Sequence, residues 1–250
     1  MKELLKNKVA VVTGGTRGIG YGIVKRFVEE GASVVLCGSR EETATKALAK
    51  LQSEIPDANA DAIWPVLTDK DAVSNAFNQV HAKYGKIDIL VNNAGIAQRT
   101  PLLDYTEKEY EDVMNLNVKA VFVCAQAAAA IMKEQGGGVI INTSSVVSLY
   151  GQTSGFGYPT SKFAVNGMTK SWARELGKYH IRVNAVAPGV VKTDMVAALP
   201  KEIIQPIIDK IPMGRMAEAE DIANAFVYLA SDMAAYVSGE ILSVDGAVVI

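Results

Sequence analysis

Short apolar runs alternate with longer amphipathic stretches along almost the whole of this 250-residue chain, and no other feature narrows its possible folds as much. The runs are rich in Val and Ile at consecutive positions, as in strands covered on both faces of a parallel sheet. They are residues 9–13, 33–37, 62–66, 87–92, 139–143, 181–187 and 241–244. The helical stretches between them include residues 19–30, 40–53, 69–84, 106–134 and 158–177. The pattern predicts an α/β fold, a Rossmann-type doubly wound parallel sheet of about seven strands with helices on both faces.

The chain shows no internal boundary. No Pro/Ser/Gly linker or block of like charge divides it, so residues 1–250 are expected to form a single domain. The segment at about 190–215 has apolar residues such as Ile203 and Ile207 at helical spacing, but Pro206 interrupts the hydrogen-bond ladder. A kinked or broken lid over the substrate site is expected there, and a helix packed on the core is the alternative.

Charge and cysteine content exclude several classes of protein. The chain has 25 basic and 27 acidic residues, which give no long-range attraction to nucleic acid or anionic lipid. Cys37 and Cys124 cannot make a disulfide framework, which favours a reducing compartment. The first residues lack a signal-peptide core, and no uninterrupted apolar stretch approaches the roughly 20 residues of a membrane span. We expect a soluble cytoplasmic protein that needs no metal and binds neither nucleic acid nor membrane.

A glycine-rich turn joins the first predicted strand to the first predicted helix. Residues 13–20 read T-G-G-T-R-G-I-G. In an open α/β sheet, ligands bind at the carboxyl ends of the strands, where a helix N-terminus offers unpaired N–H groups to a pyrophosphate. Glycines keep Cβ atoms away from the phosphates. The turn therefore predicts a dinucleotide site, with a tight turn that binds nothing as the alternative.

The end of the second strand indicates which dinucleotide binds. NAD sites place an acid there for the ribose 2′-hydroxyl, and NADP sites place a cation for the 2′-phosphate. This chain has no acid at Gly38 or Ser39, and Arg40 with Arg17 is suited to clamp a phosphate. NADP(H) is favoured over NAD(H). Ser39 is alternatively, or also, a helix cap, with Glu42 completing a Ser-x-x-Glu box.

A phenol and an ammonium lie four residues apart at Tyr158 and Lys162, hence on one helix face. Lowering a tyrosine pKa from about 10 to about 7 requires roughly 4 kcal/mol of preferential phenolate stabilisation, and a neighbouring cation is suited to provide it. Tyr21 and Lys25 have the same spacing, but only Tyr158 follows a strand ending in hydroxyl groups, N-T-S-S at 142–145. Either serine is able to hydrogen-bond an oxyanion, or both are satisfied loop hydroxyls.

Together these motifs resemble the short-chain dehydrogenase/reductase family over essentially the whole chain. Residues 13–20 match its T-G-x-x-x-G-x-G turn, 92–95 its N-N-A-G element, and 188–193 its P-G-x-x-x-T element. Tyr158 and Lys162 match its Y-x-x-x-K motif. The resemblance implies an oxidoreductase that interconverts a secondary alcohol and a ketone with a nicotinamide coenzyme.

The resemblance also implies catalytic roles. Tyr158 would be the acid/base, and Lys162 would lower its pKa and hold the nicotinamide ribose. Ser145, rather than Ser144, would bind the substrate oxygen. Asn117 would position a water behind the lysine; the alternative is a helix asparagine facing solvent, for which Asn115 serves equally well.

The coenzyme residues implied by the resemblance lie at the strand ends. They are Gly14, Thr16, Arg17, Gly18, Ile19, Gly20, Ser39, Arg40, Leu67, Asn93, Ala94, Gly95, Tyr158, Lys162, Pro188, Gly189, Val191 and Thr193. Thr193 and the backbone near Val191 would fix the carboxamide. Val66 stands where relatives often have an aspartate for the adenine amino group, which leaves that contact to the backbone near Leu67.

Two groups within the family look most similar to this chain. Bacterial bile-acid hydroxysteroid dehydrogenases, especially the 3-hydroxysteroid type, share G-F-G-Y-P at 155–159, next to the catalytic tyrosine. Bacterial 3-oxoacyl-acyl-carrier-protein reductases are the alternative, because the apolar lid residues suit a sterol or an acyl chain equally. Those lid residues are Met195, Val196, Leu199 and Ile203.

A dinucleotide-binding sensor without catalysis is the third hypothesis. Such a protein would be expected to lack one of Ser145, Tyr158 or Lys162, and all three are present. The resemblance also implies a homotetramer built on the long helices after the fourth and fifth strands and on the C-terminal strand. The apolar end at 248–250 agrees with this, because it is poorly suited to a free tail.

Overall fold

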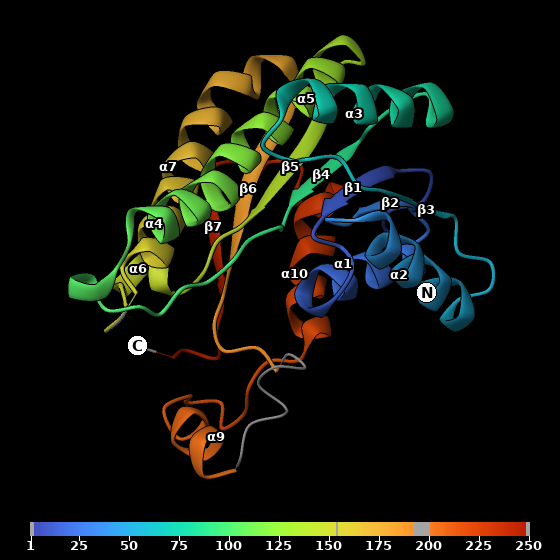
Figure 1. The fold of residues 1–250 in the computed structure, drawn as a ribbon. Coiled ribbons are helices and arrows are strands. Elements are labelled where there is room, and N and C mark those ends of the chain that lie inside the picture. Colours follow the sequence, from blue (N-terminus) through green and yellow to red (C-terminus); the bar gives the residue numbers. More distant parts are fainter. Residues whose placement is uncertain (1–2, 154, 193–200, 249–250) are drawn as a thin grey trace.

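The computed structural model describes residues 3–153, 155–192 and 201–248, and in it seven parallel strands form one sheet (Figure 1). The strands are β1 (Val9–Thr13), β2 (Ser33–Cys37), β3 (Ala60–Ile63), β4 (Ile89–Asn92), β5 (Gly138–Thr143), β6 (Ile181–Pro188) and β7 (Ile241–Val244). Their order is β3-β2-β1-β4-β5-β6-β7. The direction of winding reverses between β1 and β4, and sheets of this kind bind ligands at such a switch point.

Helices cover both faces of the sheet, as the sequence predicted (Figure 1). The first face carries α1 (Gly18–Glu29), α2 (Glu41–Glu54) and α10 (Ala219–Ala230); the second carries α3 (Lys70–Tyr84), α4 (Glu107–Met114), α5 (Ala120–Glu134) and α7 (Gly157–Leu176). Phe27 and Phe226 fill the core under the first face, and Phe77 lies under the second. Val12 enters the first core and its neighbour Val11 the second, because successive strand residues point to opposite faces. This explains why the strands are apolar at consecutive positions.

Local signals set several helix ends. The Asp69 carboxylate accepts hydrogen bonds from the backbone N–H groups of Asp71 and Ala72 and so caps α3. That helix ends at Gly85, which has a φ of 79°. A capping box between Thr106 and Glu109 begins α4. These are the side chains that satisfy the unpaired groups of a helix terminus.

Two elements differ from the sequence prediction. Strand β3 spans Ala60–Ile63 instead of 62–66, because Pro65 has no N–H to donate to the sheet. The helix expected over 106–134 is interrupted by a π-helical segment, η2 (Asn115–Lys119), between α4 and α5. A π turn accommodates extra residues in the helix and is often found at functional sites. Here it contains Asn117.

The run Glu107–Glu134 is long and apolar enough, by length and composition alone, to cross a membrane. Helix α5 within it buries Val123, Ala128 and Met132 in the core beneath the second face of the sheet. Charged residues such as Glu107 and Lys108 lie in its first turns. The run therefore has the contacts of a core helix.

The expected lid is only partly within the described residues. Residues 193–200, which include Thr193, Met195, Val196 and Leu199, lie outside them. Helix α9 (Lys201–Ile208) follows and lies apart from the sheet (Figure 1). It continues through Pro206, so the helix is not broken at that residue, and the expected kink and lid stay predictions. A proline removes one donor only, and this helix ends two residues later.

Candidate active site

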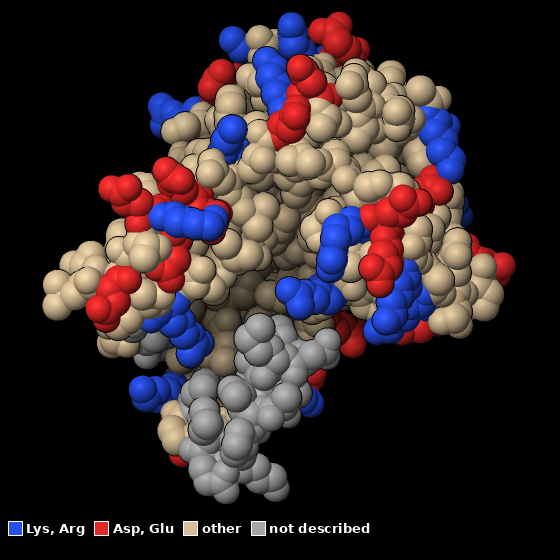
Figure 2. All heavy atoms as spheres, viewed as in Figure 1, with Lys and Arg blue, Asp and Glu red and all other residues tan. Residues whose placement is uncertain are grey.

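A cavity of about 540 Å³ opens at the carboxyl ends of β1 and β4. Its lining includes ten of the residues expected to bind the coenzyme: Gly14, Thr16, Arg17, Ile19, Gly20, Ser39, Leu67, Asn93, Ala94 and Gly95. A larger cavity of about 650 Å³ lies at the opposite edge of the sheet, near Lys8, Arg182 and Tyr236, and contains none of them. Figure 2 shows the face drawn hollowed near its centre, with basic and acidic side chains interspersed around it. The switch-point cavity is therefore the candidate site.

The glycine turn is packed so closely against the end of β4 that Gly14 and Gly20 have no room for side chains. A Cβ on Gly20 would lie 2.1 Å from the Gly14 carbonyl oxygen and 2.5 Å from Asn93 Nδ2. Gly14 has a φ of 65°, and its Cβ would lie 2.9 Å from Ala94 Cα. Thr13 Oγ1 accepts hydrogen bonds from the backbone N–H groups of Asn93 and Ala94, at 2.9 and 3.1 Å. The N-N-A-G element thus holds the turn in place.

This packing leaves the start of α1 open to an anion. The helix begins at Gly18, and its N-cap residue, Arg17, makes no side-chain capping hydrogen bond. The N–H groups of a first turn without such a cap are suited to phosphate oxygens. The turn and the cavity beside it therefore fit the pyrophosphate of a dinucleotide. Thr13, whose hydroxyl fixes the turn, was not among the expected site residues; its place as first residue of the T-G motif was the available signal.

Ser39 and Arg17 both line the cavity and are exposed. Helix α2 has Arg40 as its N-cap residue and no side-chain capping hydrogen bond, so the interpretation of Ser39 as its cap is wrong. The helix begins one residue too late for that role. Arg40 is exposed and follows Ser39 directly, although it is not among the lining residues. Val66 is 65% exposed and has no side-chain acceptor for an adenine amino group.

Three catalytic candidates meet at the carboxyl end of β5. Tyr158 and Lys162 lie one turn apart on α7, with Lys162 Nζ 5.7 Å from the centroid of the Tyr158 ring. Lys162 Nζ donates to the Thr143 carbonyl oxygen at 2.7 Å. The Ser145 hydroxyl is hydrogen-bonded to the Tyr158 phenol. From the sequence, these residues were expected to lie near one another only because they follow the same predicted strand. The structure places them together.

Burial dominates the ionisation of this group. It raises the pKa of Tyr158, while the hydrogen bond with Ser145 lowers it. Burial also lowers the pKa of Lys162 to about 8, because the residue is only 4% exposed. Lys162 is not among the groups that shift the Tyr158 pKa in the chain alone, so the expected lowering of that pKa by Lys162 stays a prediction for the coenzyme complex.

The other tyrosine–lysine pair lies elsewhere. Lys25 pairs with Glu54 at 2.8 Å, on the outer side of α1 and α2. Burial and Glu54 raise the pKa of Tyr21 to about 12, which makes it unsuited to act as a base. Position after a strand, and not the spacing alone, distinguished the two pairs.

Asn117 is fully buried in η2, whereas Asn115 is exposed. Its Oδ1 accepts from Ile96 N at 2.9 Å, and its Nδ2 donates to Ile96 O at 2.8 Å and to Ser161 Oγ at 3.0 Å. The alternative that Asn117 faces solvent is wrong. A Cβ on Gly95 would lie 3.1 Å from Asn117 Oδ1 and 3.8 Å from Lys162 Nζ, so the asparagine is close to the lysine.

Ser144 does not face the phenol. Its hydroxyl donates to Asn166 Oδ1 at 2.6 Å and lies 3.0 Å from Ser148 Oγ. Of the two serines, Ser145 is the one hydrogen-bonded to the phenol, and its contact with a substrate oxygen stays a prediction. Ser148 and Asn166 were not singled out from the sequence. Asn166 lies four residues after Lys162, which was the one available signal.

The residues expected after β6 lie beyond the cavity lining. Gly189 N donates to the Val244 carbonyl oxygen at 3.0 Å, and a Cβ on Gly189 would lie 2.6 Å from Asp245 Cα. Pro188 is the last residue of β6 and is buried. Val191 forms a parallel bridge with Ala217. They form a base at the carboxyl end of β6, and the expected Thr193 lies outside the described residues.

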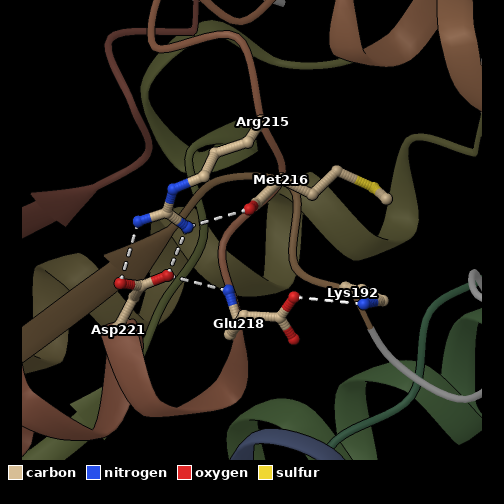
Figure 3. A network of polar contacts seen from close by, with 5 residues as sticks. All are labelled: Lys192, Arg215, Met216, Glu218 and Asp221. Carbon is tan, nitrogen blue, oxygen red and sulfur yellow. Dashed lines mark hydrogen bonds and ion pairs between the residues drawn. The ribbon is translucent and has the colours of Figure 1, made fainter.

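That base is tied to the start of α10 (Figure 3). Lys192 Nζ pairs with Glu218 Oε1 at 3.2 Å. Arg215 pairs with Asp221 at 2.6 Å and donates to the Met216 carbonyl oxygen at 3.1 Å. The Asp221 carboxylate also accepts from Glu218 N at 2.8 Å. These contacts join Lys192, which follows β6, to the residues at the start of α10.

Comparisons with known proteins agree with this geometry. A family model described as enoyl-(acyl carrier protein) reductase matches residues 14–248. The chain is 63% identical, over 99% of both chains, to a 3alpha-hydroxysteroid dehydrogenase of Mediterraneibacter gnavus. It is 39% identical, over 98% of this chain and 99% of the other, to a 3-oxoacyl-(acyl-carrier-protein) reductase of Thermotoga maritima. A solved 7 alpha-hydroxysteroid dehydrogenase, complexed with NADH and 7-oxo glycochenodeoxycholic acid, superposes with a TM-score of 0.92 at 34% identity, covering 99% of this chain and 96% of that one.

Proposed function

Because the chain belongs to the short-chain dehydrogenase/reductase family of oxidoreductases, we propose that it interconverts a secondary alcohol and a ketone on a hydroxysteroid, specifically a bile acid. The full-length identity of 63% to a 3alpha-hydroxysteroid dehydrogenase is the observation that carries this substrate class. The contact of Ser145 with Tyr158, beside Lys162, supports catalysis over a sensor without activity.

Tyr158, Ser145 and Lys162 have different roles in the proposed interconversion of alcohol and ketone. A nicotinamide coenzyme supplies or accepts the hydride when it is bound. In alcohol oxidation Tyr158 takes the hydroxyl proton, and in ketone reduction its phenol gives a proton to the carbonyl oxygen. Ser145 donates a hydrogen bond to the same oxygen. Lys162, held by the Thr143 carbonyl, favours the phenolate because an opposite charge stabilises the ionised form.

Asn117 completes the proposed set. It lies close to Lys162 and is fully buried in the π-helical segment. We assign it the positioning of a water behind the lysine ammonium. Replacement by alanine is expected to slow turnover more than it weakens substrate binding, and an unchanged rate would contradict the assignment.

NADP(H) is the preferred coenzyme in this proposal, and NAD(H) is the alternative. Arg17 lines the cavity, with Ser39 at its edge and Arg40 next along the chain. Two guanidinium groups near a ribose favour a 2′-phosphate. The test compares the Michaelis constants for NADPH and NADH, and a lower value for NADH would reverse the preference. The remaining proposed coenzyme contacts are those at Pro188, Gly189, Val191 and Thr193, with Leu67 beside the adenine.

A 3-oxoacyl-acyl-carrier-protein reductase is the second candidate, favoured by the 39% identity to such an enzyme. The interspersed charges in Figure 2 do not form the basic patch that an acidic carrier protein requires on the face drawn. Coenzyme consumption with a 3-oxo bile acid and with an acetoacetyl thioester separates the two. Faster turnover of the thioester would contradict the steroid assignment, and equal turnover would show broad specificity.

We further propose that residues 1–250 form a single domain with a substrate lid at about 190–215, that the protein is cytoplasmic, and that it is a homotetramer. The single seven-stranded sheet supports the first statement. The buried thiols of Cys37 and Cys124 agree with a reducing compartment. Cell fractionation tests the location, and a calorimetric scan with two separate transitions would contradict the single domain.

A further inference from the structure

A set of hydrogen bonds lies directly behind Ser145. The Ser144 hydroxyl donates to Asn166 Oδ1 at 2.6 Å, and Asn166 Nδ2 donates to Ser148 Oγ at 2.8 Å. The Ser148 hydroxyl donates in turn to the Ser145 carbonyl oxygen at 2.6 Å. Ser144 and Ser148 are each 1% exposed, so water does not replace these bonds readily. The network holds the residue before Ser145 and the backbone of Ser145 itself.

Asn166 connects this loop to the helix that carries the acid/base. It lies four residues after Lys162 and eight after Tyr158 on α7, and residues at this spacing share a helix face. Ser144 and Ser148 belong to the segment between β5 and α7, with Ser148 in the short helix α6 (Val147–Tyr150). Asn166 is thus the link between the helix that bears the phenol and the loop that bears its hydroxyl partner.

We propose that Asn166 is a positioning residue that fixes the Ser145 hydroxyl relative to the Tyr158 phenol. The carboxamide offers an acceptor to Ser144 and a donor to Ser148, and both are needed. Valine has neither group, and aspartate lacks the donor. A displacement of about 1 Å at a reacting group is able to reduce rate by about 10²-fold. This inference rests on the proposed function, because Ser145 acts there on the substrate oxygen.

The first test is kinetic. Asn166→Val is expected to lower kcat about 10- to 100-fold, within the range for a displaced reacting group, with the KM for coenzyme within about twofold. Ser148→Ala should have a smaller effect, because Ser148 N still donates to the Ser145 carbonyl at 2.9 Å. Thr169→Val is the matched control: Thr169 is fully buried one turn further along α7 and bonds Asn142 and Val165 instead. The proposal would be overturned if Asn166→Val kept the kcat of the parent, or if Thr169→Val lost as much kcat as Asn166→Val.

The second test needs no catalysis. The pKa of the Tyr158 phenol is measured in the coenzyme-free protein by NMR with ¹³Cζ-labelled tyrosine, and Tyr158→Phe identifies the signal. Since the Ser145 hydrogen bond lowers this pKa, Asn166→Val and Asn166→Asp should raise it, whereas Thr169→Val should leave it unchanged. Lys162, whose Nζ lies 5.7 Å from the ring centroid, is retained in every variant. An unchanged pKa in Asn166→Val would overturn the proposal even if the parent reduced no steroid.

A double-mutant cycle with Ser145→Ala shows through which residue Asn166 acts. If it acts through the Ser145 hydroxyl, Asn166→Val should slow the Ser145→Ala enzyme by less than about twofold, since coupled residues are not additive. If Asn166→Val slowed the Ser145→Ala enzyme as much as it slows the parent, Asn166 would act elsewhere, and the assignment would be overturned. Absence of steroid turnover in the parent, with the NMR shift present, would instead remove the proposed substrate and leave the positioning role supported.

Discussion

The Lys162 ammonium is the most tightly enclosed charge of the site, and its environment explains the chemistry open to Tyr158. It keeps a hydrogen bond to the Thr143 carbonyl but has no carboxylate among its described contacts. An ammonium without a carboxylate partner remains available to a developing phenolate. Burial alone makes both side chains favour their neutral forms. The attraction between the Lys162 ammonium and the Tyr158 phenolate is therefore strongest when the phenol gives up its proton.

Replacement of the phenol tests the acid/base role. Tyr158→Phe keeps the ring and removes the hydroxyl, so kcat should fall by about 10²-fold or more, the typical contribution of a general acid or base. The dissociation constant for coenzyme, measured by fluorescence titration, should change by less than about threefold. Tyr150→Phe, on an exposed residue of α6, is the control and should keep the parent rate. Turnover of Tyr158→Phe within tenfold of the parent would refute the role.

The buried lysine predicts a pH-dependent stability. The Lys162 pKa is about 8 in the folded chain and about 10.4 in the unfolded chain, so the unfolded chain binds more protons between these values. Stability therefore rises with pH in that window, and the full cost of burial applies below it. The unfolding free energy of the parent minus that of Lys162→Met should rise by about 2–3 kcal/mol between about pH 7 and pH 10, measured in urea.

An exposed lysine of the same helix provides the comparison. Lys170→Met should differ from the parent by an amount that stays nearly constant over this pH range, because Lys170 is solvated. If the difference in unfolding free energy between the parent and Lys162→Met were also nearly constant over this pH range, Lys162 would not be buried as a charge.

At the scale of elements, two loops that are distant in sequence form the surface proposed to bind the coenzyme phosphates. Asn93, directly after β4, is hydrogen-bonded to Thr13 at the end of β1, where the glycine turn begins. Asn93 Nδ2 donates to the carbonyl oxygens of Thr13 and Gly14, at 3.2 Å each. The Asn93 side chain therefore holds the turn in place through its backbone carbonyl groups.

Gly20→Ala should weaken coenzyme binding by more than about tenfold, because the new Cβ would lie 2.1 Å from a backbone oxygen and must displace the turn. Isothermal titration measures the loss. Gly167→Ala is the matched control, since its Cβ would meet nothing within 4 Å on α7. That variant should gain about 0.5–1 kcal/mol of stability and bind coenzyme as the parent does. Equal binding by Gly20→Ala would contradict the crowding at the turn.

Periodicity predicted the elements, but it did not locate their internal breaks. The strands were expected close to their observed places because seven apolar runs stood between helical stretches. The break at Asn115–Lys119 has no proline or glycine to mark it, so a continuous helix was expected. Asn117 is buried only because of where that break places it, and nothing in the local sequence separated it from Asn115. Ser39 similarly matched a capping box that forms no cap, because α2 begins after Arg40.

At the scale of the whole molecule, the order of the strands brings the main elements of the site to one edge of the sheet. The side-chain contacts of Asn166 join residues that are far apart in the sequence. Parallel connections bring the carboxyl ends of β1, β4 and β5 to one edge, so residues 13–20, 93–95 and 145 follow strands that end at that edge. Motif order along the chain was enough to predict this. The link through Asn166 was not predictable, since it depends on the register of α7 against a loop eighteen or more residues earlier. Side-chain contacts across such distances carry no local signal.

The outer face of α5 and α7 should be the surface through which chains associate. Phe122 on α5 is 45% exposed and Phe163 on α7 is 50% exposed, and a groove of about 350 Å³ between the helices includes Phe122 and Trp172. Exposed aromatic side chains on a monomer often mark an interface. Light scattering should give the parent a mass of four 26.6 kDa chains. Phe122→Glu should reduce that mass, because it places a charge where apolar contact is required.

Ala49→Glu makes the same change on exposed α2, on the other side of the sheet, and should keep the parent mass (Figure 1). The helices concerned also carry the site, since α7 bears Tyr158 and Lys162 and η2 precedes α5. Dissociation should therefore lower activity along with mass, and both should return as protein concentration rises. If the parent had the mass of one chain, there would be no interface. If Ala49→Glu alone reduced the mass, the interface would lie elsewhere.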